Sequence, residues 1–176
     1  MVGRDRALQL LHQVLALVPA DQAEATLLVQ DHALTRFANN SIHQNVARQD
    51  TRLAVRAVVD GRVGAALTNL LDGEGQRRVA EQAAAIARLQ PPDPGFPGLP
   101  AGQPPREART FFEATAATTA GQRAEAVGAV VNAAARLGFQ ATGAFAAEAE
   151  ELAIANTSGV AVYAPLTLAS LRTVVD

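Results

Sequence analysis

The chain has 176 residues, of which 49% are hydrophobic, enough to bury the core of one domain or of one and a half domains. Its net charge of −2 argues against a general attraction to nucleic acid or to an anionic membrane surface. Because the chain has no cysteine, disulfides, thiolate catalysis and cysteine-ligated zinc sites are excluded.

The first element expected is an amphipathic helix over residues 6–17, with Asp5 as its cap and Pro19 as its stop. No small-residue cleavage pattern follows a long apolar run, so this segment is not a signal peptide. No stretch approaches the ~18 apolar residues that are needed to span a bilayer. We therefore expect a cytoplasmic protein without a membrane partner.

Strand patterns follow, joined by turn residues. Asn39-Asn40-Ser41 is expected to form a turn, because asparagine tolerates positive φ. Asp60-Gly61 is a strong two-residue hairpin signal between alternating runs. The expected strands are residues 24–31, 34–37, 42–50, 51–59 and 62–68.

A helix is expected next over residues 74–90, whose apolar face is formed by Val79, Ala83, Ile86 and Leu89. A segment rich in proline and glycine comes next and is neither helix nor central strand, because proline lacks the N–H donor. Another helix is expected over residues 118–138, with Gly138 as its stop. Two or more strands then run to the end of the chain, which looks cut short because the last strand lacks a partner.

Together these elements predict an α+β fold: a largely antiparallel sheet of hairpins and meanders packed against two or three long helices. Residues 1–90 form a helix, a β-meander and a helix, and residues 91–105 are a proline- and glycine-rich connection. Residues 106–176 supply the helix and hairpin portion of the same domain. Each half contains a helix and a meander, but the halves show no clear residue identity.

Metal binding is disfavoured by the positions of the three histidines. His12 has no histidine or carboxylate at i+4 of its helix. His32 and His43 could face each other across neighbouring strands, with Asp31 as a third ligand, but their spacing does not force the three to converge. We therefore expect no metal site in this chain.

Two charged clusters have structural explanations as well as functional ones. Arg48, Arg52 and Arg56 could form an anion patch, but a solvated sheet face offset by Asp50 and Asp60 explains them better, and no nucleic-acid partner is expected. The cluster of Glu148, Glu150 and Glu151 lies on one element, whereas catalytic carboxylates need unlike environments across a cleft.

Several motifs in series resemble the N-terminal domain of the TldD/PmbA family, the metallopeptidases also called modulators of DNA gyrase. They match in order and spacing over essentially the whole chain, which makes them more specific together than any one alone. The motifs are LTRFANNSIHQNV, LAVRAVVDGRVGAALTN, AIARLQPPDPGFPGLP and EELAIANTSGVAVY.

The resemblance implies a longer parent protein. Family members carry a C-terminal domain in which an H-E-x-x-x-H helix and a later cysteine hold zinc, and this chain has neither. No zinc ligand can be carried over, so zinc is expected only in the missing C-terminal domain or in a partner subunit. Whether the chain belongs to an enzyme stays open, but alone it is expected to be inactive. The resemblance further implies a homo- or heterodimer that handles a peptide substrate.

The polar run after residue 35 supplies the candidate contact residues, which are Arg36, Asn39, Asn40, His43 and Gln44. They could offer hydrogen bonds to an extended substrate peptide or to the partner domain. Equally, they could satisfy the turn and its neighbours. A second function of a different class is a regulatory protein-binding module that acts through an exposed sheet edge.

Overall fold

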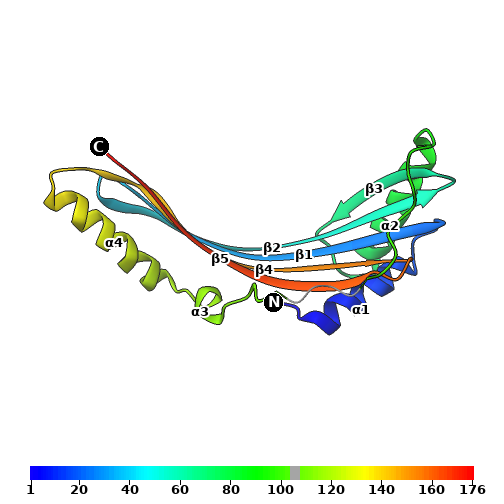
Figure 1. Cartoon of the computed structure of the whole chain (residues 1–176), viewed down its shortest axis with the longest axis horizontal. Coiled ribbons are helices and arrows are strands. Elements are labelled where there is room, and N and C mark those ends of the chain that lie inside the picture. The colour runs from blue at the N-terminus through cyan, green and yellow to red at the C-terminus, as the bar shows by residue number, and fades with distance from the viewer. Residues whose placement is uncertain (104–107) are drawn as a thin grey trace. The chain divides into compact units, whose positions relative to one another are not determined.

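The structure, a computed structural model, describes residues 1–103 and 108–176. Its strands form one five-stranded sheet in the order β3-β2-β1-β4-β5 (Figure 1). The elements in chain order are α1 (Arg4–Leu15), β1 (Gln22–Ala38), β2 (Ser41–Val59), β3 (Arg62–Thr68), α2 (Gly73–Leu89), α3 (Glu113–Ala116), α4 (Ala120–Arg136), β4 (Ala141–Asn156) and β5 (Ala161–Val175). This confirms the α+β fold with long helices packed on an antiparallel sheet.

Strands β1 and β4, which are distant in sequence, lie side by side in the sheet. The side chain of Gln30 donates to Glu150, and His32 pairs with Glu148 at 3.0 Å. A step of two residues forward on β1 therefore matches a step of two backward on β4, which is the pattern of an antiparallel pair.

Both hairpins in the first half close through two-residue turns with positive φ. Asn39 and Asn40 have φ of 49° and 58°, and Asp60 and Gly61 have φ of 50° and 70°. Positive φ at both central positions defines a type I′ turn, whose twist matches that of the flanking strands. Asparagine, aspartate and glycine adopt this conformation at low cost, so the turns are encoded locally. Ser41, expected in the first turn, already belongs to β2.

Several boundaries differ from the expectations. The expected strands at 24–31 and 34–37 are one continuous strand, β1. Strand β5 runs unbroken through Pro165. The N-cap of α1 is Gly3, and Asp5 lies in the first turn, where its charge favours the helix N-terminus.

Among the described residues, the chain divides into two compact units. One comprises Met1–Val29, Asp50–Ala108 and Glu151–Ala164, and the other comprises Gln30–Gln49, Arg109–Glu150 and Pro165–Asp176. The long strands β1, β2, β4 and β5 each contribute residues to both units, so the units do not follow the order of the chain.

The core of the first unit is built from one face of the sheet and from α1 and α2. On α2 the expected apolar face is partly wrong, because Ile86 is 38% exposed and Leu89 is 84% exposed. The buried side of α2 is instead lined by Val79 and by small residues, namely Ala80, Ala83, Ala84 and Ala87. These alanines let the helix approach β3 closely, and at Gly64 a Cβ would stand 2.2 Å from the backbone nitrogen of Ala87.

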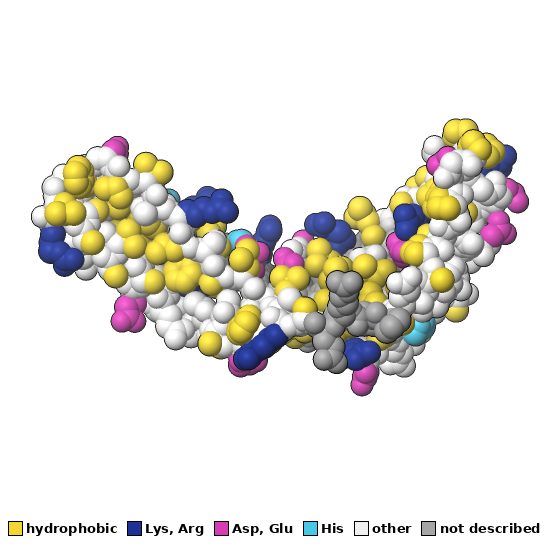
Figure 2. Space-filling model, in the orientation of Figure 1, with side chains coloured by type: hydrophobic (Ala, Val, Ile, Leu, Met, Phe, Trp, Pro, Cys, Tyr) yellow, Lys and Arg dark blue, Asp and Glu magenta, His cyan; other side chains and the backbone are white. Residues whose placement is uncertain are grey.

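The second unit has a smaller core beneath α4, where Phe37, Val127, Ala134 and Ala141 are buried together. Figure 2 shows hydrophobic side chains in yellow over the outside of α4, a helix made largely of alanine and valine. A capping box between Thr119 and Gln122 begins this helix. Just beyond its end lies Gly138, with φ of 78°, as the sequence predicts.

None of the helices within residues 1–103 and 108–176 has the length and apolar character needed to cross a membrane.

Candidate functional site

The hairpin tip between β1 and β2 carries the five candidate contact residues. Two of them bond to each other, since Arg36 donates from Nη1 to the side-chain oxygen of Gln44 at 3.2 Å. His43 and Asn39 are exposed, and Asn39 occupies the first position of the turn. Arg36, Asn39, His43 and Gln44 are thus all exposed at this hairpin tip.

Asn40 has a structural partner. Its amide nitrogen donates to the carbonyl of Phe139 at 2.9 Å, and its amide oxygen accepts from the N–H of Ala141 at 2.8 Å. The backbone N–H of Asn40 also donates to the carbonyl of Ala141. The side chain therefore acts as a peptide group that fastens the hairpin tip to the start of β4.

His32 pairs with a carboxylate instead of with His43. Its Nδ1 lies 3.0 Å from Oε1 of Glu148, and both side chains are about one-quarter exposed. The neighbouring pair, Gln30 and Glu150, lies two residues away on each strand. Within the two described stretches of the chain, no group of three or more histidine, aspartate or glutamate side chains is placed to hold a metal.

The three glutamates of the acidic cluster have separate partners. Glu148 and Glu150 contact β1, whereas Glu151 is 2% exposed and belongs to the first unit. The Glu151 carboxylate accepts from the backbone N–H groups of Val2 and Gly3, the latter at 2.7 Å, and from the hydroxyl of Tyr163 at 2.5 Å.

These contacts set the ionisation of both groups. Burial by itself raises the pKa of Glu151, but the hydrogen bonds from Tyr163, Val2 and Gly3 outweigh it and hold the pKa below its ordinary value. Burial, together with the hydrogen bond to Glu151 and its negative charge, raises the pKa of Tyr163. The carboxylate thus stays charged and the phenol stays neutral over a wide pH range.

A pocket of about 350 Å³ lies in the second unit. Strand alternation places Ala33, Ala147 and Ala149 on the face that packs against α4, because Thr35 and Phe145 lie on that face. The side chains of His32 and Glu148 therefore point to the opposite face of the sheet. The lining residues are Asp31, His32, Ala33, Ala47, Arg48, Gln49, Ala116, Thr118, Ala147, Glu148 and Ala149.

Beside the pocket, the guanidinium of Arg123 is almost completely buried. It donates to the hydroxyl of Thr35 at 3.1 Å, to the carbonyl of Thr118 at 3.1 Å and to the side-chain oxygen of Asn45 at 2.9 Å. All three acceptors are neutral, so these hydrogen bonds replace the water that the buried cation has lost. The arginine joins β1, β2 and the segment before α4.

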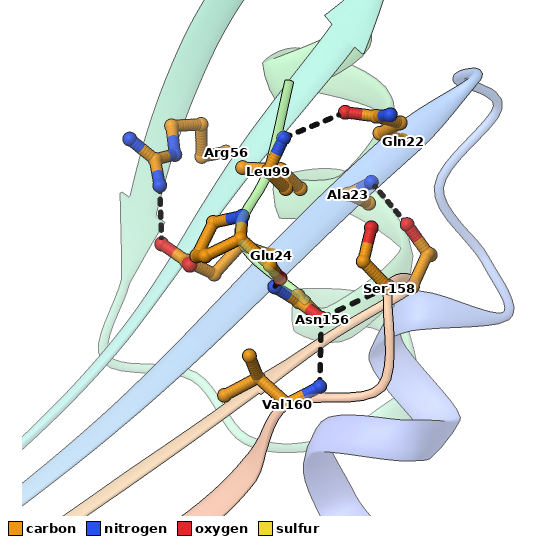
Figure 3. Close-up of polar contacts among 10 residues, drawn as sticks. Gln22, Ala23, Glu24, Arg56, Leu99, Asn156, Ser158 and Val160 are labelled. Atoms are coloured by element: carbon orange, nitrogen blue, oxygen red, sulfur yellow. Dashed lines mark hydrogen bonds and ion pairs between the residues drawn. The ribbon is translucent and has the colours of Figure 1, made fainter. Parts of the chain in front are cut away.

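The arginines on β2 are partly engaged. Arg56 bonds to Glu24 at 2.8 Å, as Figure 3 shows, and Arg52 lies 3.8 Å from Asp50. These pairs within the chain reduce the positive charge that an anion would meet.

The end of the sheet in the first unit holds the proline-rich connection through side chains. Gln22 accepts from the N–H of Leu99 at 2.9 Å, and Asn156 donates to the carbonyl of Pro100 at 2.9 Å (Figure 3). The same Asn156 accepts from the N–H groups of Ser158 and Val160, which closes the turn between β4 and β5. In its described part, residues 91–103, the connection has no helix or strand.

Sequence reasoning missed the pocket, Arg123 and the partners of Glu151. The alanines of the pocket alternate along β4. This alternation predicts a strand, but it does not indicate a pocket. Arg123 occurs in a helix pattern where an exposed arginine is the usual expectation. Its burial depends on a contact with strands far away in the sequence.

Comparison with known proteins gives a consistent result. Residues 24–87 match the model of PmbA/TldA metallopeptidase domain 1. No curated protein shows a significant match to the chain.

Three solved structures share the fold. TldE from Thermococcus kodakarensis has a TM-score of 0.83 and 21% identity, over 95% of this chain and 40% of that one. A putative modulator of DNA gyrase from Bacteroides thetaiotaomicron has a TM-score of 0.82 and 14% identity, and the match covers 98% of this chain and 41% of that one. A putative modulator of a DNA gyrase from Thermotoga maritima has a TM-score of 0.79 and 15% identity, and the match covers 95% of this chain and 41% of that one.

The chain thus spans about 40% of the length of these solved structures. The family match over residues 24–87 and the fold shared over nearly the whole chain together confirm the resemblance to the N-terminal domain of the TldD/PmbA family.

Proposed function

We propose that this chain is the N-terminal, non-catalytic domain of a TldD/PmbA-type zinc metallopeptidase and that it helps to enclose or guide a peptide substrate. The observation that carries the proposal is the match to domain 1, together with the coverage of only about 40% of the solved chains. Proteolysis would then belong to the intact assembly of this domain with a C-terminal domain or a partner subunit, as a homo- or heterodimer.

The residues present do not fit a zinc site. The chain has three histidines and no cysteine, and His32 is paired with Glu148. We propose that zinc is held by the C-terminal domain or by the partner subunit.

The sheet face opposite α4 in the second unit supports a guiding role. It carries two partly exposed polar pairs, Gln30 with Glu150 and His32 with Glu148. Carboxylate, imidazole and amide groups can bond to the backbone of an extended peptide or to the rest of the assembly. The exposed hairpin tip, with Arg36, His43 and Gln44, adds donors and acceptors in the same unit.

The test measures zinc content and peptide hydrolysis of the purified chain, with zinc added and with a chelator as control. We expect no cleavage by the chain alone. Adding a separately purified TldD/PmbA-type domain that contains H-E-x-x-x-H should give cleavage that this chain stimulates. A double variant, His32→Ala with Glu148→Ala, should reduce the stimulation, whereas Arg77→Ala on the exposed side of α2 should not.

One equivalent of zinc bound by this chain alone, with cleavage that a chelator abolishes, would overturn the proposal. Failure of the chain to stimulate a catalytic domain would overturn the guiding role.

A regulatory protein-binding module is the second candidate, because two of the solved structures with this fold are named as putative modulators of DNA gyrase. Here the supercoiling activity of DNA gyrase would be measured with and without the chain. An effect on supercoiling in the absence of any protease would favour this candidate.

A further inference from the structure

The pocket of the second unit has a floor of alanines on neighbouring strands. Thr35 on β1 bonds to Asn45 on β2 at 3.3 Å, which aligns the two strands. In an antiparallel pair, two steps back along one strand match two steps forward along the other, so Ala33 lies opposite Ala47. Strand alternation puts both alanines on the same face of the sheet as Thr35, and both line the pocket.

Strand β4 extends this floor on the other side of β1. Because His32 pairs with Glu148, the next residue along β1, Ala33, lies opposite Ala147 on the pocket face of the sheet. The lining residues from outside the sheet belong to α3 and the segment after it, namely Ala116 and Thr118. Short side chains beneath this one covering segment leave the hollow. The alanines of the floor are Ala33, Ala47, Ala147 and Ala149.

One end of the floor is acidic. Asp31 lines the pocket and lies two residues from Ala33 on β1, so its carboxylate is on the same face. An ionised carboxylate has about four lone-pair sites and can accept several hydrogen bonds at once. Gln49 lies opposite Asp31 on β2 and adds an amide oxygen. Strand alternation places the other charged residues of the lining on the opposite face of the sheet, namely His32, Arg48 and Glu148.

The other end of the pocket lies beside a buried cation. Arg123 donates to the carbonyl of Thr118, which lines the pocket, and to the hydroxyl of Thr35. Thr35 and Asp31 are four residues apart on β1, about 13 Å along an extended strand. The pocket therefore has a cationic end and an anionic end, and a bound cation is drawn to the Asp31 end.

Size and lining together restrict the occupant. Ligand pockets range from roughly 300 to 1,000 Å³, and this one, at about 350 Å³, is at the small end. It suits one long side chain and is too small for a folded segment. Lysine and arginine bury their alkyl stems on apolar surface while their charged heads reach a polar group. The alanine floor matches such a stem, and the carboxylate of Asp31 matches such a head.

We propose that this pocket binds a lysine or arginine side chain of a peptide, with its stem over the alanines and its charged head at Asp31 and Gln49. The pocket lies on the α4 face of the sheet, so this contact is additional to the polar pairs on the opposite face. The inference rests on the proposed function only in that the domain handles peptides, and it names the class of side chain that the domain would recognise.

The experiment titrates the full purified chain, labelled with nitrogen-15, with capped tripeptides and follows the backbone amide signals by nuclear magnetic resonance. The peptides differ only at the central residue, which is lysine, norleucine or glutamate. Norleucine keeps the alkyl stem and lacks the charge. We expect about tenfold tighter binding of the lysine peptide than of the norleucine peptide, because the latter cannot form the charge-assisted hydrogen bond. Saturable shifts are expected at the amides of Ala33, Ala47, Ala147 and Ala149.

Two variants test the two parts of the pocket. Asp31→Asn keeps the size of the side chain but removes its charge, and should lower the affinity for the lysine peptide to that for the norleucine peptide. Ala47→Leu places a larger side chain on the floor at an exposed position and should weaken binding of both peptides. The control, Glu125→Gln, removes a negative charge from an exposed position of α4 outside the lining and should change neither affinity. Thermal unfolding shows whether each variant is folded, and Ala47→Leu carries the test if Asp31→Asn is not.

Equal affinities for the lysine and norleucine peptides would overturn the choice of a basic side chain. Tighter binding of the glutamate peptide would also overturn it and would assign the pocket to an acidic side chain beside Arg123. The absence of saturable shifts at the floor would overturn the site itself. None of these results touches the proposed function, which is decided by zinc content and by stimulation of a catalytic domain.

Discussion

The guanidinium of Arg123 on α4 donates a hydrogen bond to the side chain of Asn45 on β2 over 2.9 Å, across a sequence separation of 78 residues. With its bonds to Thr35 and Thr118, this contact joins three segments of the second unit. Arg123 is 3% exposed and its acceptor Thr35 is 1% exposed, so water has little access to that hydrogen bond, whereas Asn45 is exposed.

Replacing Arg123 by methionine should therefore lower the free energy of unfolding by about 2 kcal/mol, since the buried hydroxyl of Thr35 loses its donor and the contacts to Asn45 and Thr118 are lost with it. Urea unfolding followed by circular dichroism measures the change. The matched control is Arg136→Ala at the exposed end of the same helix, for which a change within about 0.5 kcal/mol is expected. Equal effects of the two substitutions would contradict the clamping role of Arg123.

The first hairpin turn allows its backbone and side-chain contributions to be separated. Asn39→Gly and Asn40→Gly both keep a residue that tolerates positive φ. Only the second removes the bonds to Phe139 and Ala141. We expect Asn40→Gly to be less stable than Asn39→Gly by about 1 kcal/mol in urea unfolding. Indistinguishable stabilities would show that the side-chain clasp contributes nothing.

The raised pKa of Tyr163 can be observed directly. Tyr163 is the only tyrosine and the chain has no tryptophan, so absorbance at 295 nm reports its ionisation alone. We expect half-ionisation well above pH 10 in the folded chain, because burial and the hydrogen bond to Glu151 disfavour the phenolate. Glu151→Gln should move the midpoint back toward 10. A wild-type midpoint at 10 would refute the contact.

The lowered pKa of Glu151 predicts a pH dependence of stability. A carboxyl whose pKa is lower in the folded chain than in the unfolded chain stabilises the fold. This stabilisation is complete at pH values above the unfolded-state pKa and is lost as the pH falls through the folded-state pKa. The difference in unfolding free energy between wild type and Glu151→Gln should be full at pH 7 and should shrink below about 4.5. Urea titrations from pH 7 to 3 check this, and a constant difference would argue against it.

Two glycines make a matched pair for the packing of α2. At Gly64 a Cβ would stand 2.2 Å from the nitrogen of Ala87 and 2.5 Å from the carbonyl oxygen of Ala83, whereas at Gly128 in α4 it meets nothing within 4 Å. Gly64→Ala should destabilise by about 1–3 kcal/mol, because backbone atoms cannot yield. Gly128→Ala should stabilise by up to about 1 kcal/mol through helix propensity. Thermal unfolding of both variants measures these changes, and equal effects of the two substitutions would contradict the close contact at Gly64.

Local features of the sequence were sufficient for the elements whose causes are local. The β2–β3 hairpin followed from alternation on both sides of Asp60-Gly61, and the structure pairs Leu53 with Thr68 and Val59 with Arg62. The end of α4 followed from Gly138, because glycine takes a positive φ after a helix without strain. The helix and strand patterns together predicted the α+β class before any contact was known.

Other features required the folded chain. The exposed Leu89 on α2 and the buried Arg123 on α4 both reverse the usual preference of their residue types, because burial depends on what packs against a helix and not on its own pattern. The sequence singled out Arg36, His43 and Gln44 as polar exceptions in a strand run, and their role as contact residues stays a prediction. The bonds between the Asn40 side chain and the start of β4 could not be predicted from the sequence, since Phe139 and Ala141 lie about a hundred residues away.

The sequence by itself determined the two turns with positive φ, the stop of α4 at Gly138 and the lack of cysteine that excludes a cysteine–zinc site, because these depend on single residues and their neighbours. Only the tertiary structure decided that β1 lies beside β4 and that Glu151 binds the N-terminal backbone. Those facts arise from pairing between distant segments, where register is selected by the burial of a whole sheet face and no short stretch of sequence carries it.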